Sequence, residues 1–249
     1  MDITGNTILI TGGGSGIGRA LAEALHARGN KVIVSGRRAA ALEDVAAATP
    51  GIATATLDVS DPADISRFAA EIVAAHPDLN AVIHNAGIMQ AEDLASAGSD
   101  LAIAEATIAT NLLGPLRLNA ALLPHLLAQP RAAVLTVTSG LAFVPLVATP
   151  TYSATKAAIH SWTQALRGQL RGTSVEVIEI APPAVATDLM PGHAQNPNSM
   201  PLADYIAETM VQLEAGAAEN LTERVKFLRF AEARGDYAKV FAILNDGTH

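Results

Sequence analysis

Short runs rich in β-branched residues alternate with long runs rich in alanine and leucine along most of this chain. Such alternation predicts right-handed βαβ units, which build a parallel sheet with helices on both faces. The central short runs are almost entirely apolar, as expected of strands that helices cover on both sides. We therefore predict an α/β fold with a Rossmann-type, doubly wound sheet. Its strands are expected at residues 6–11, 31–35, 52–59, 81–85, 132–139 and 174–180.

The chain has 249 residues, half of them apolar, and no linker or repeat divides it. This is enough for one large core, so we predict a single domain over residues 1–249 with six strands in the order 3-2-1-4-5-6. After residue 219, apolar side chains recur at helical spacing. This pattern predicts a helical tail in place of a seventh strand, and no strand among residues 235–247.

Charge and cysteine content exclude several classes of function. The net charge is −8, and no block of lysine and arginine is present, which argues against nucleic acid and anionic membranes as partners. The absence of cysteine excludes disulfides, thiol catalysis and thiolate metal sites. The histidines lack ligand spacing, so no metal is predicted. Without a signal peptide or a long apolar run, the chain is expected to be cytoplasmic.

A glycine-rich segment, "ITGGGSGIGRA", lies where the first predicted strand becomes the first predicted helix. Backbone N–H groups at a helix start favour a phosphate, and glycines let a pyrophosphate approach closely. The spacing of Gly12, Gly16 and Gly18 gives T-G-x-x-x-G-x-G, which differs from both G-x-G-x-x-G and the P-loop. The segment predicts dinucleotide binding, with a purely structural turn as the alternative.

The end of the second predicted strand bears on the choice of dinucleotide. An acidic residue there would bind a ribose 2′-hydroxyl, but the chain has Gly36, Arg37 and Arg38. Glycine does not repel a 2′-phosphate, and an arginine fork suits one. We therefore predict NADP(H) rather than NAD(H). The alternative is that both arginines are merely solvated.

Tyr152 and Lys156 lie four positions apart in "TYSATKAAIH", so on a helix they point the same way. Taken alone, the two residues are better explained as a solvent-exposed pair. Together with the glycine turn, "HNAG" at 84–87, Asn111 and Ser139, they resemble the motifs of the short-chain dehydrogenase/reductase family over about residues 6–190. The segments "VTSGLAF" and "RGTSVEVIEIAPPAV" resemble those of the bacterial DltE-type oxidoreductases within it.

The resemblance implies roles for four residues. Tyr152 would be the acid–base group, and the charge of Lys156 would lower the tyrosine pKa from its ordinary value near 10. Lys156 would also bond the nicotinamide ribose. Ser139, at the carboxyl edge of the sheet, would hold the substrate oxygen. Asn111 would bend a long helix and fix a water that leads to the lysine, or only form the bend.

The resemblance also implies a set of cofactor contacts. Asp58 and Val59 would meet the adenine, and Val185 and Thr187 would bond the carboxamide. The full set is Gly12, Gly14, Ser15, Gly16, Ile17, Gly18, Arg37, Arg38, Asp58, Val59, Asn85, Ala86, Gly87, Tyr152, Lys156, Pro182, Val185 and Thr187. Two departures from the family pattern are His84 in place of asparagine, interpreted as structural, and Pro183 in place of glycine, which removes one N–H.

The implied activity is reduction of a carbonyl, or oxidation of the alcohol, by direct hydride transfer with NADP(H). The alternative is an NADP(H)-binding redox sensor without turnover. Epimerases with the same Tyr/Lys motif need about a hundred more residues. The expected partners are a small-molecule substrate and a second copy of the chain, bound through helices at about 100–128 and 152–170, with a tetramer less favoured.

Apolar residues around Ser139 favour an apolar or aromatic substrate. A Pro/Gly/Asn-rich stretch at 190–201 predicts a lid over about residues 188–215. The candidate wall residues are Ile88, Met89, Leu141, Phe143 and Met190.

Overall fold

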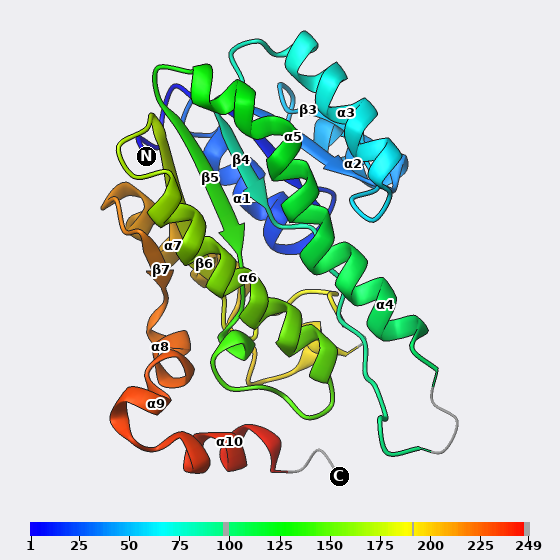
Figure 1. The fold of residues 1–249 in the computed structure, drawn as a ribbon, viewed down its shortest axis with the longest axis vertical. Helices are drawn as coiled ribbons and strands as arrows, with labels where there is room; N and C mark the ends of the chain where they lie inside the picture. Colours follow the sequence, from blue (N-terminus) through cyan, green and yellow to red (C-terminus); the bar gives the residue numbers. More distant parts are fainter. Residues whose placement is uncertain (97–99, 191, 247–249) are drawn as a thin grey trace.

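A parallel seven-stranded sheet with strand order β3-β2-β1-β4-β5-β6-β7 forms the centre of the protein (Figure 1). The computed structural model describes residues 1–96, 100–190 and 192–246. Every pair of neighbouring strands runs parallel. The strands are β1 Thr7–Thr11, β2 Lys31–Gly36, β3 Ala53–Thr56, β4 Ala81–His84, β5 Ala132–Val137, β6 Val175–Ala181 and β7 Glu219–Leu221.

Helices cover both faces of the sheet. Successive side chains of a strand point to opposite faces, and here the side chains on both faces are apolar. Ile8 and Ile10 enter a core with residues of α1, α2 and α7, whereas Leu9 enters a second core with residues of α3, α5 and α6. None of these helices, nor any other in the described residues, is long and apolar enough to cross a membrane. The helices are α1 Gly16–His26, α2 Ala39–Ala48, α3 Pro62–Ala75, α4 Ala102–Ile108, α5 Gly114–Ala128, α6 Pro150–Gln169, α7 Leu202–Glu214, α8 Glu223–Arg229, α9 Ala231–Arg234 and α10 Tyr237–Asn245.

The predicted α/β class and the order of the first six strands are confirmed, but the predicted number of strands is wrong. The seventh strand, β7, lies just before the helical tail and has only three residues. Glutamate and asparagine are uncommon in strands, and three residues show no alternation to detect. The helical tail itself is confirmed as α8, α9 and α10. Residues 235–246 contain no strand, and residue 247 lies outside the described part of the chain.

A glutamine side chain completes the outer edge of β7. On its inner edge, this strand pairs with β6, with Glu219 opposite Glu179. On its outer edge, Gln212 of α7 donates to the carbonyl of Leu221 at 2.8 Å and accepts from its N–H at 2.6 Å. Backbone N–H and C=O groups at a sheet edge need water or another hydrogen-bonding partner. The Gln212 amide pairs with those of Leu221 as a neighbouring strand would.

The segment expected to form a lid begins after β6 and ends in α7. A one-residue parallel bridge joins Val185 to Met200. The side chains of Tyr205, Met210 and Leu213 on α7 are buried in the core that also contains β1. Residue 191, inside the expected lid, lies outside the described residues. Movement of the segment that leads into α7 remains a prediction.

We predict that Gln212→Ala lowers the free energy of unfolding by about 1–2 kcal/mol, since it leaves both polar groups of Leu221 without this partner. Urea denaturation followed by circular dichroism measures the change. Gln90→Ala, at an exposed position, serves as the control. Equal stability of the two variants would show that the amide does not support β7.

Candidate active site

The glycine turn after β1 is packed against the end of β4. Gly12 has a φ of +67°, and a Cβ there would lie 2.8 Å from the Cα of Ala86. A Cβ on Gly18 would lie 2.3 Å from Nδ2 of Asn85. Both positions therefore require glycine, because real Cβ atoms do not approach other atoms so closely. The turn brings the predicted residues at 12–18 and 85–87 together.

Thr11 fastens these two segments, and the sequence analysis did not single it out as a site residue. Its hydroxyl accepts hydrogen bonds from the N–H groups of Asn85 at 3.0 Å and Ala86 at 3.1 Å. Nδ2 of Asn85 donates in return to the carbonyls of Thr11 at 2.9 Å and Gly12 at 3.3 Å. The threonine that opens the T-G-x-x-x-G-x-G pattern was the available signal.

The start of α1 has the features of a phosphate site. Ser15 is the N-cap residue and makes no side-chain cap hydrogen bond, so the first N–H groups of the helix are free of that competitor. Nη2 of Arg38 lies 3.4 Å from Oγ of Ser15, and both Arg37 and Arg38 are exposed. A guanidinium beside a helix start, with Gly36 adding no negative charge, suits a phosphate-bearing ligand.

Asp58 and Val59 lie in the segment that follows β3. Oδ1 of Asp58 accepts from the N–H of Ser60 at 2.9 Å and from its hydroxyl at 2.6 Å, which fixes the carboxylate. Val59 is buried against the first residue of α5, where a Cβ on Gly114 would lie 2.7 Å from the Val59 carbonyl oxygen. This close approach places the segment next to the start of α5.

Three predicted catalytic residues meet where β5 ends and α6 begins. The hydroxyl of Ser139 lies close enough to the phenol of Tyr152 to lower the phenol pKa. Lys156 places Nζ 5.4 Å from the centroid of the Tyr152 ring and donates to the carbonyl of Val137 at 2.8 Å. All three side chains are buried. The serine, phenol and amine therefore form one cluster at the carboxyl edge of the sheet.

The pKa values of this cluster differ from the sequence-based expectation. Burial raises the pKa of Tyr152 to about 12, and the hydrogen bond from Ser139 opposes that rise only in part. Burial also lowers the pKa of Lys156 to about 8. We expected the lysine to lower the tyrosine pKa; in the polypeptide the loss of hydration dominates instead, because it disfavours the charged form of each group.

Asn111 lies in a π-helical turn, Ala109–Leu113, between α4 and α5. Its amide donates to the carbonyl of Ile88 and accepts from the Ile88 N–H, both at 2.8 Å. A Cβ on Gly87 would lie 3.3 Å from Oδ1 of Asn111 and 3.8 Å from Nζ of Lys156. The helix irregularity expected at Asn111 is thus present, and it joins Asn111 to the segment after β4 and to the lysine.

The segment after β6 returns to the glycine turn. The carbonyl of Pro182 accepts from the N–H of Gly140 at 2.8 Å. Thr187 lies 3.5 Å from where a Cβ on Gly16 would be, and its hydroxyl donates to the carbonyl of Val185 at 3.4 Å. Pro182, Val185 and Thr187 thus connect the serine side of the site to the phosphate side.

Residues 6–198 match the family model for short chain dehydrogenases. The chain belongs to the short-chain dehydrogenase/reductase family. It is 41% identical over 250 residues to the uncharacterized oxidoreductase DltE of Bacillus subtilis, with 98% of each chain covered. The predicted resemblance is therefore confirmed, and the protein is an enzyme of this family.

Solved structures of short-chain dehydrogenases share the fold. One from Burkholderia cenocepacia in complex with NADP has a TM-score of 0.82 and 26% identity, covering 98% of this chain and 99% of its own. Another from Burkholderia phymatum in complex with NAD has a TM-score of 0.80 and 22% identity, with 96% of each chain covered. These neighbours hold different nicotinamide cofactors, so they leave the preference of this dehydrogenase/reductase open.

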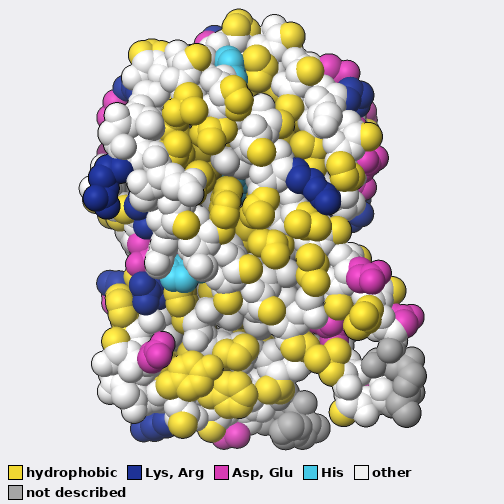
Figure 2. All heavy atoms as spheres, in the orientation of Figure 1, with side chains coloured by type: hydrophobic (Ala, Val, Ile, Leu, Met, Phe, Trp, Pro, Cys, Tyr) yellow, Lys and Arg dark blue, Asp and Glu magenta, His cyan; other side chains and the backbone are white. Residues whose placement is uncertain are grey.

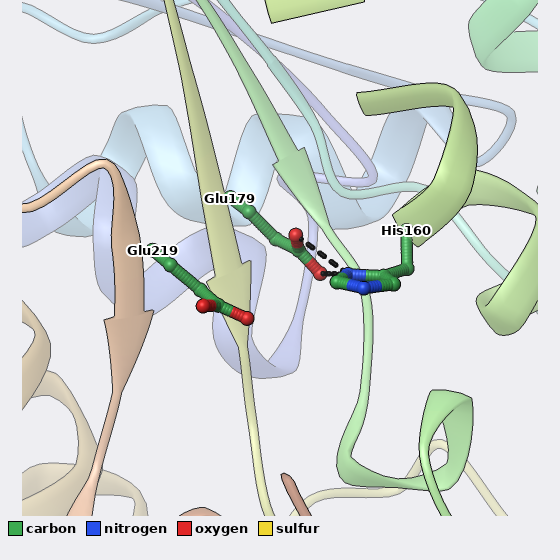
Figure 3. A group of neighbouring side chains, drawn as sticks. All are labelled: His160, Glu179 and Glu219. Carbon is green, nitrogen blue, oxygen red and sulfur yellow. Dashed lines mark hydrogen bonds and ion pairs between the residues drawn. The ribbon is translucent and has the colours of Figure 1, made fainter. Parts of the chain in front are cut away.

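Two histidines lie near the strand ends, His84 buried and His160 partly buried. Burial lowers the pKa of His84 to about 4, so this last residue of β4 is neutral at neutral pH. His160 of α6 lies beside Glu179 of β6 and Glu219 of β7, with one donor atom of each within 4.8 Å of the others (Figure 3). The sequence analysis missed the group of His160, Glu179 and Glu219, because these residues are far apart in sequence and come together only when β6, β7 and α6 pack side by side.

We predict that the dehydrogenase/reductase gains stability from Lys156 as the pH rises. Below about 8 the lysine is charged in both folded and unfolded chains, and the folded chain bears the cost of burying that charge. Between about 8 and 10.5 the folded lysine is neutral while the unfolded one is still charged, so the cost falls. Relative to Lys156→Met, the wild type should gain roughly 2 kcal/mol between about pH 7 and 9.5.

Urea denaturation of both proteins across this range measures the gain. Below about pH 10 the phenol of Tyr152 does not interfere, because it is protonated in both states. Parallel pH profiles for the wild type and Lys156→Met would contradict a buried lysine with a lowered pKa.

Proposed function

We propose that the protein is an NADP(H)-dependent dehydrogenase/reductase that reduces a small-molecule carbonyl, or oxidises the corresponding alcohol, by direct hydride transfer. The observation that carries the proposal is the buried cluster of Ser139, Tyr152 and Lys156 at the edge of the sheet where the glycine turn also lies. Ligands of open α/β sheets bind at this carboxyl edge. A sensor without turnover has no need for a phenol hydrogen-bonded to a serine there.

Each residue of the cluster has its own role in the proposed reduction. Bound NADPH supplies the hydride. Ser139 donates a hydrogen bond to the carbonyl oxygen of the substrate, and Tyr152 donates a proton to the same oxygen. With a pKa of about 12, the phenol is protonated at neutral pH, which is the form that a general acid needs. The ammonium of Lys156 stabilises the phenolate left behind, and Asn111 holds the segment at Gly87 and Ile88 beside the lysine.

The residues around the glycine turn fit a dinucleotide. Gly12 and Gly18 let the turn pack tightly against the end of β4, and Arg38 stands beside the start of α1. Arg37 and Arg38 would hold a 2′-phosphate, and Gly36 leaves room for it.

A homodimer through α4, α5 and α6 is part of the proposal. An apolar depression of about 410 Å³ lies between the end of α4, the π-helical turn that follows it and the start of α6. Ile108 is 39% exposed there, as expected of a residue that a second copy covers. The depression is lined by Ile108, Leu112, Pro150, Thr151, Ala154 and Thr155.

We predict that Tyr152→Phe abolishes carbonyl reduction, at least about a hundredfold, while the affinity for NADPH changes little. The variant keeps the ring and removes only the proton donor. NADPH consumption with a panel of ketones, aldehydes and diketones measures turnover, and fluorescence titration measures binding. Tyr237→Phe, on the exposed side of α10, is the matched control. Substantial turnover by Tyr152→Phe would refute the assignment.

We also predict a change of cofactor preference on combining Gly36→Asp with Arg37→Ala. The added carboxylate repels a 2′-phosphate and accepts from a ribose hydroxyl, while one guanidinium is lost. The ratio of kcat/KM with NADPH to that with NADH should fall at least about tenfold, which corresponds to about 1.4 kcal/mol. Arg171→Ala, at another exposed arginine, should leave the ratio unchanged. An unaltered ratio in the double variant would exclude these residues from phosphate recognition.

A further inference from the structure

A fully buried carboxylate lies beside the backbone that leads to Ser139. Glu179 of β6 has a relative exposure of 0%. One of its oxygens accepts from the hydroxyl of Thr138 at 2.7 Å, and both lie 2.8 Å from Nδ1 of His160 (Figure 3). Nδ1–H donates to the carboxylate, because the amide nitrogen of Gln164 lies 2.8 Å from Nε2 and donates there. A buried carboxylate is costly unless it accepts hydrogen bonds. The side chains of Thr138 and His160 are therefore held in the orientations that supply those bonds.

An ion pair lies next to this hydrogen-bonded carboxylate. Glu219 of β7, the register partner of Glu179, accepts from Nε of Arg229 at 2.6 Å and from Nη2 at 3.4 Å. Arg229 is the last residue of α8. The two carboxylates are therefore close to each other, and each has its own partner.

The two pairs enclose one aromatic ring. The guanidinium carbon of Arg229 lies 4.8 Å from the centroid of Phe143, and the ring of His160 meets Phe143 at 4.8 Å with an interplanar angle of 80°. Phe143 also packs against Ala181, Leu221 and Val225. We call this set the Phe143 socket: His160, Glu179, Glu219 and Arg229.

The socket changes the interpretation of Phe143. The sequence analysis expected this side chain in the wall of the substrate pocket. Its observed contacts instead come from α6, the ends of β6 and β7, and α8. Phe143 is therefore an anchor for the loop in which it lies.

Phe143 and Ser139 are the two ends of the same turn. Ser139 is the N-cap and Phe143 the C-cap of the 3-10 turn Gly140–Ala142. Oγ of Ser139 accepts from the N–H of Leu141, and the N–H of Phe143 donates to the carbonyl of Gly140, both at 3.1 Å. In a turn this short, a shift of Phe143 is passed on to the serine hydroxyl.

Helix α8 also presses directly on this turn. A Cβ on Gly140 would lie 2.7 Å from Cδ1 of Leu228 and 3.0 Å from Cγ2 of Val225. In Figure 1, α8 to α10 lie beyond the carboxyl ends of β5, β6 and β7. Contacts from the tail therefore reach the turn at Gly140 and Phe143, while Glu179 holds Thr138 on the other side of Ser139.

A metal ion is the competing interpretation of the socket. One histidine and two glutamates with donor atoms within 4.8 Å of one another are a donor set that zinc or manganese can use. However, the guanidinium of Arg229 already supplies the positive charge beside Glu219, and Glu179 is bonded to Thr138 and His160. The contacts thus describe a network in which each carboxylate already has hydrogen-bonding partners.

We propose that Arg229 and His160 are positioning residues for Ser139. Through Glu219 and Glu179 they hold Phe143 and Thr138, and so aim the serine hydroxyl at Tyr152. The inference rests on the proposed function of Ser139. It assigns the helical tail, which follows the residues 6–198 matched by the family model, a part in the active site.

The test compares Arg229→Ala and Arg229→Lys with the wild type. Arg234→Ala is the matched control, since Arg234 also belongs to the tail and faces an aromatic ring, that of Phe227 at 5.7 Å. With NADPH and a carbonyl substrate, Arg229→Ala should lower kcat at least about tenfold, because a misplaced hydrogen-bonding group loses alignment with the reacting atoms. Arg229→Lys should recover part of the loss, and the Kd for NADPH should stay within about twofold in all variants.

Hydrogen–deuterium exchange gives a second readout that needs no turnover. Arg229→Ala should increase exchange at the amides of Leu141 and Phe143 several-fold, and Arg234→Ala should not. Unchanged exchange in Arg229→Ala would overturn the inference, as would equal kcat values for Arg229→Ala and the wild type. Stoichiometric Zn²⁺ or Mn²⁺ in the purified protein, lost in His160→Gln, would also overturn it in favour of a metal site.

The two proposals can fail separately. A wild-type protein that binds NADPH but reduces no carbonyl counts against the proposed function. In that case, faster exchange in Arg229→Ala still supports the positioning of the Ser139 turn by the socket.

Discussion

The hydrogen bond from Lys156 to the carbonyl of Val137 fastens α6 to the end of β5, and the geometry of the site depends on it. Val137 is the last residue of its strand, so the lysine fixes the helix at the point where the chain turns toward Ser139. One helical turn earlier on the same stripe, Tyr152 then comes within reach of the serine. The amine thus has a structural task as well as an electrostatic one.

This arrangement buries two ionisable groups, and burial shifts the pKa of each toward its neutral form. Burial raises the pKa of Tyr152 to about 12 and lowers that of Lys156 to about 8. At neutral pH the phenol keeps its proton, whereas the lysine retains most of its charge. In the proposed mechanism the phenol gives up its proton next to this cation, and the cation stabilises the phenolate more strongly where there is little water.

Much of this could be predicted from the sequence, because it depends on local patterns. Apolar runs and helical periodicity gave the first six strands and the tail, and the motif around Gly12, Tyr152 and Lys156 indicated the family. The three residues of β7 escaped notice because the strand depends on Gln212 and β6 rather than on its own composition. The predicted shift of the Tyr152 pKa had the wrong direction. The spacing in the sequence shows that a lysine is near the tyrosine, but it does not show that the folded chain removes water from the phenol.

The socket around Phe143 illustrates the same limit, since its charged residues come from α6, β6, β7 and α8 and share no motif. It also raises a question of energy. Buried ion pairs often contribute little more to stability than apolar side chains of similar size, so stability alone does not account for Glu179 and His160 in this place. Apolar packing is non-directional, whereas a carboxylate that accepts from both Thr138 and His160 fixes each of them in one orientation. Under the proposed function, the Ser139 hydroxyl points at one substrate oxygen and so needs directional support, which Glu179 and Arg229 provide on either side of its turn.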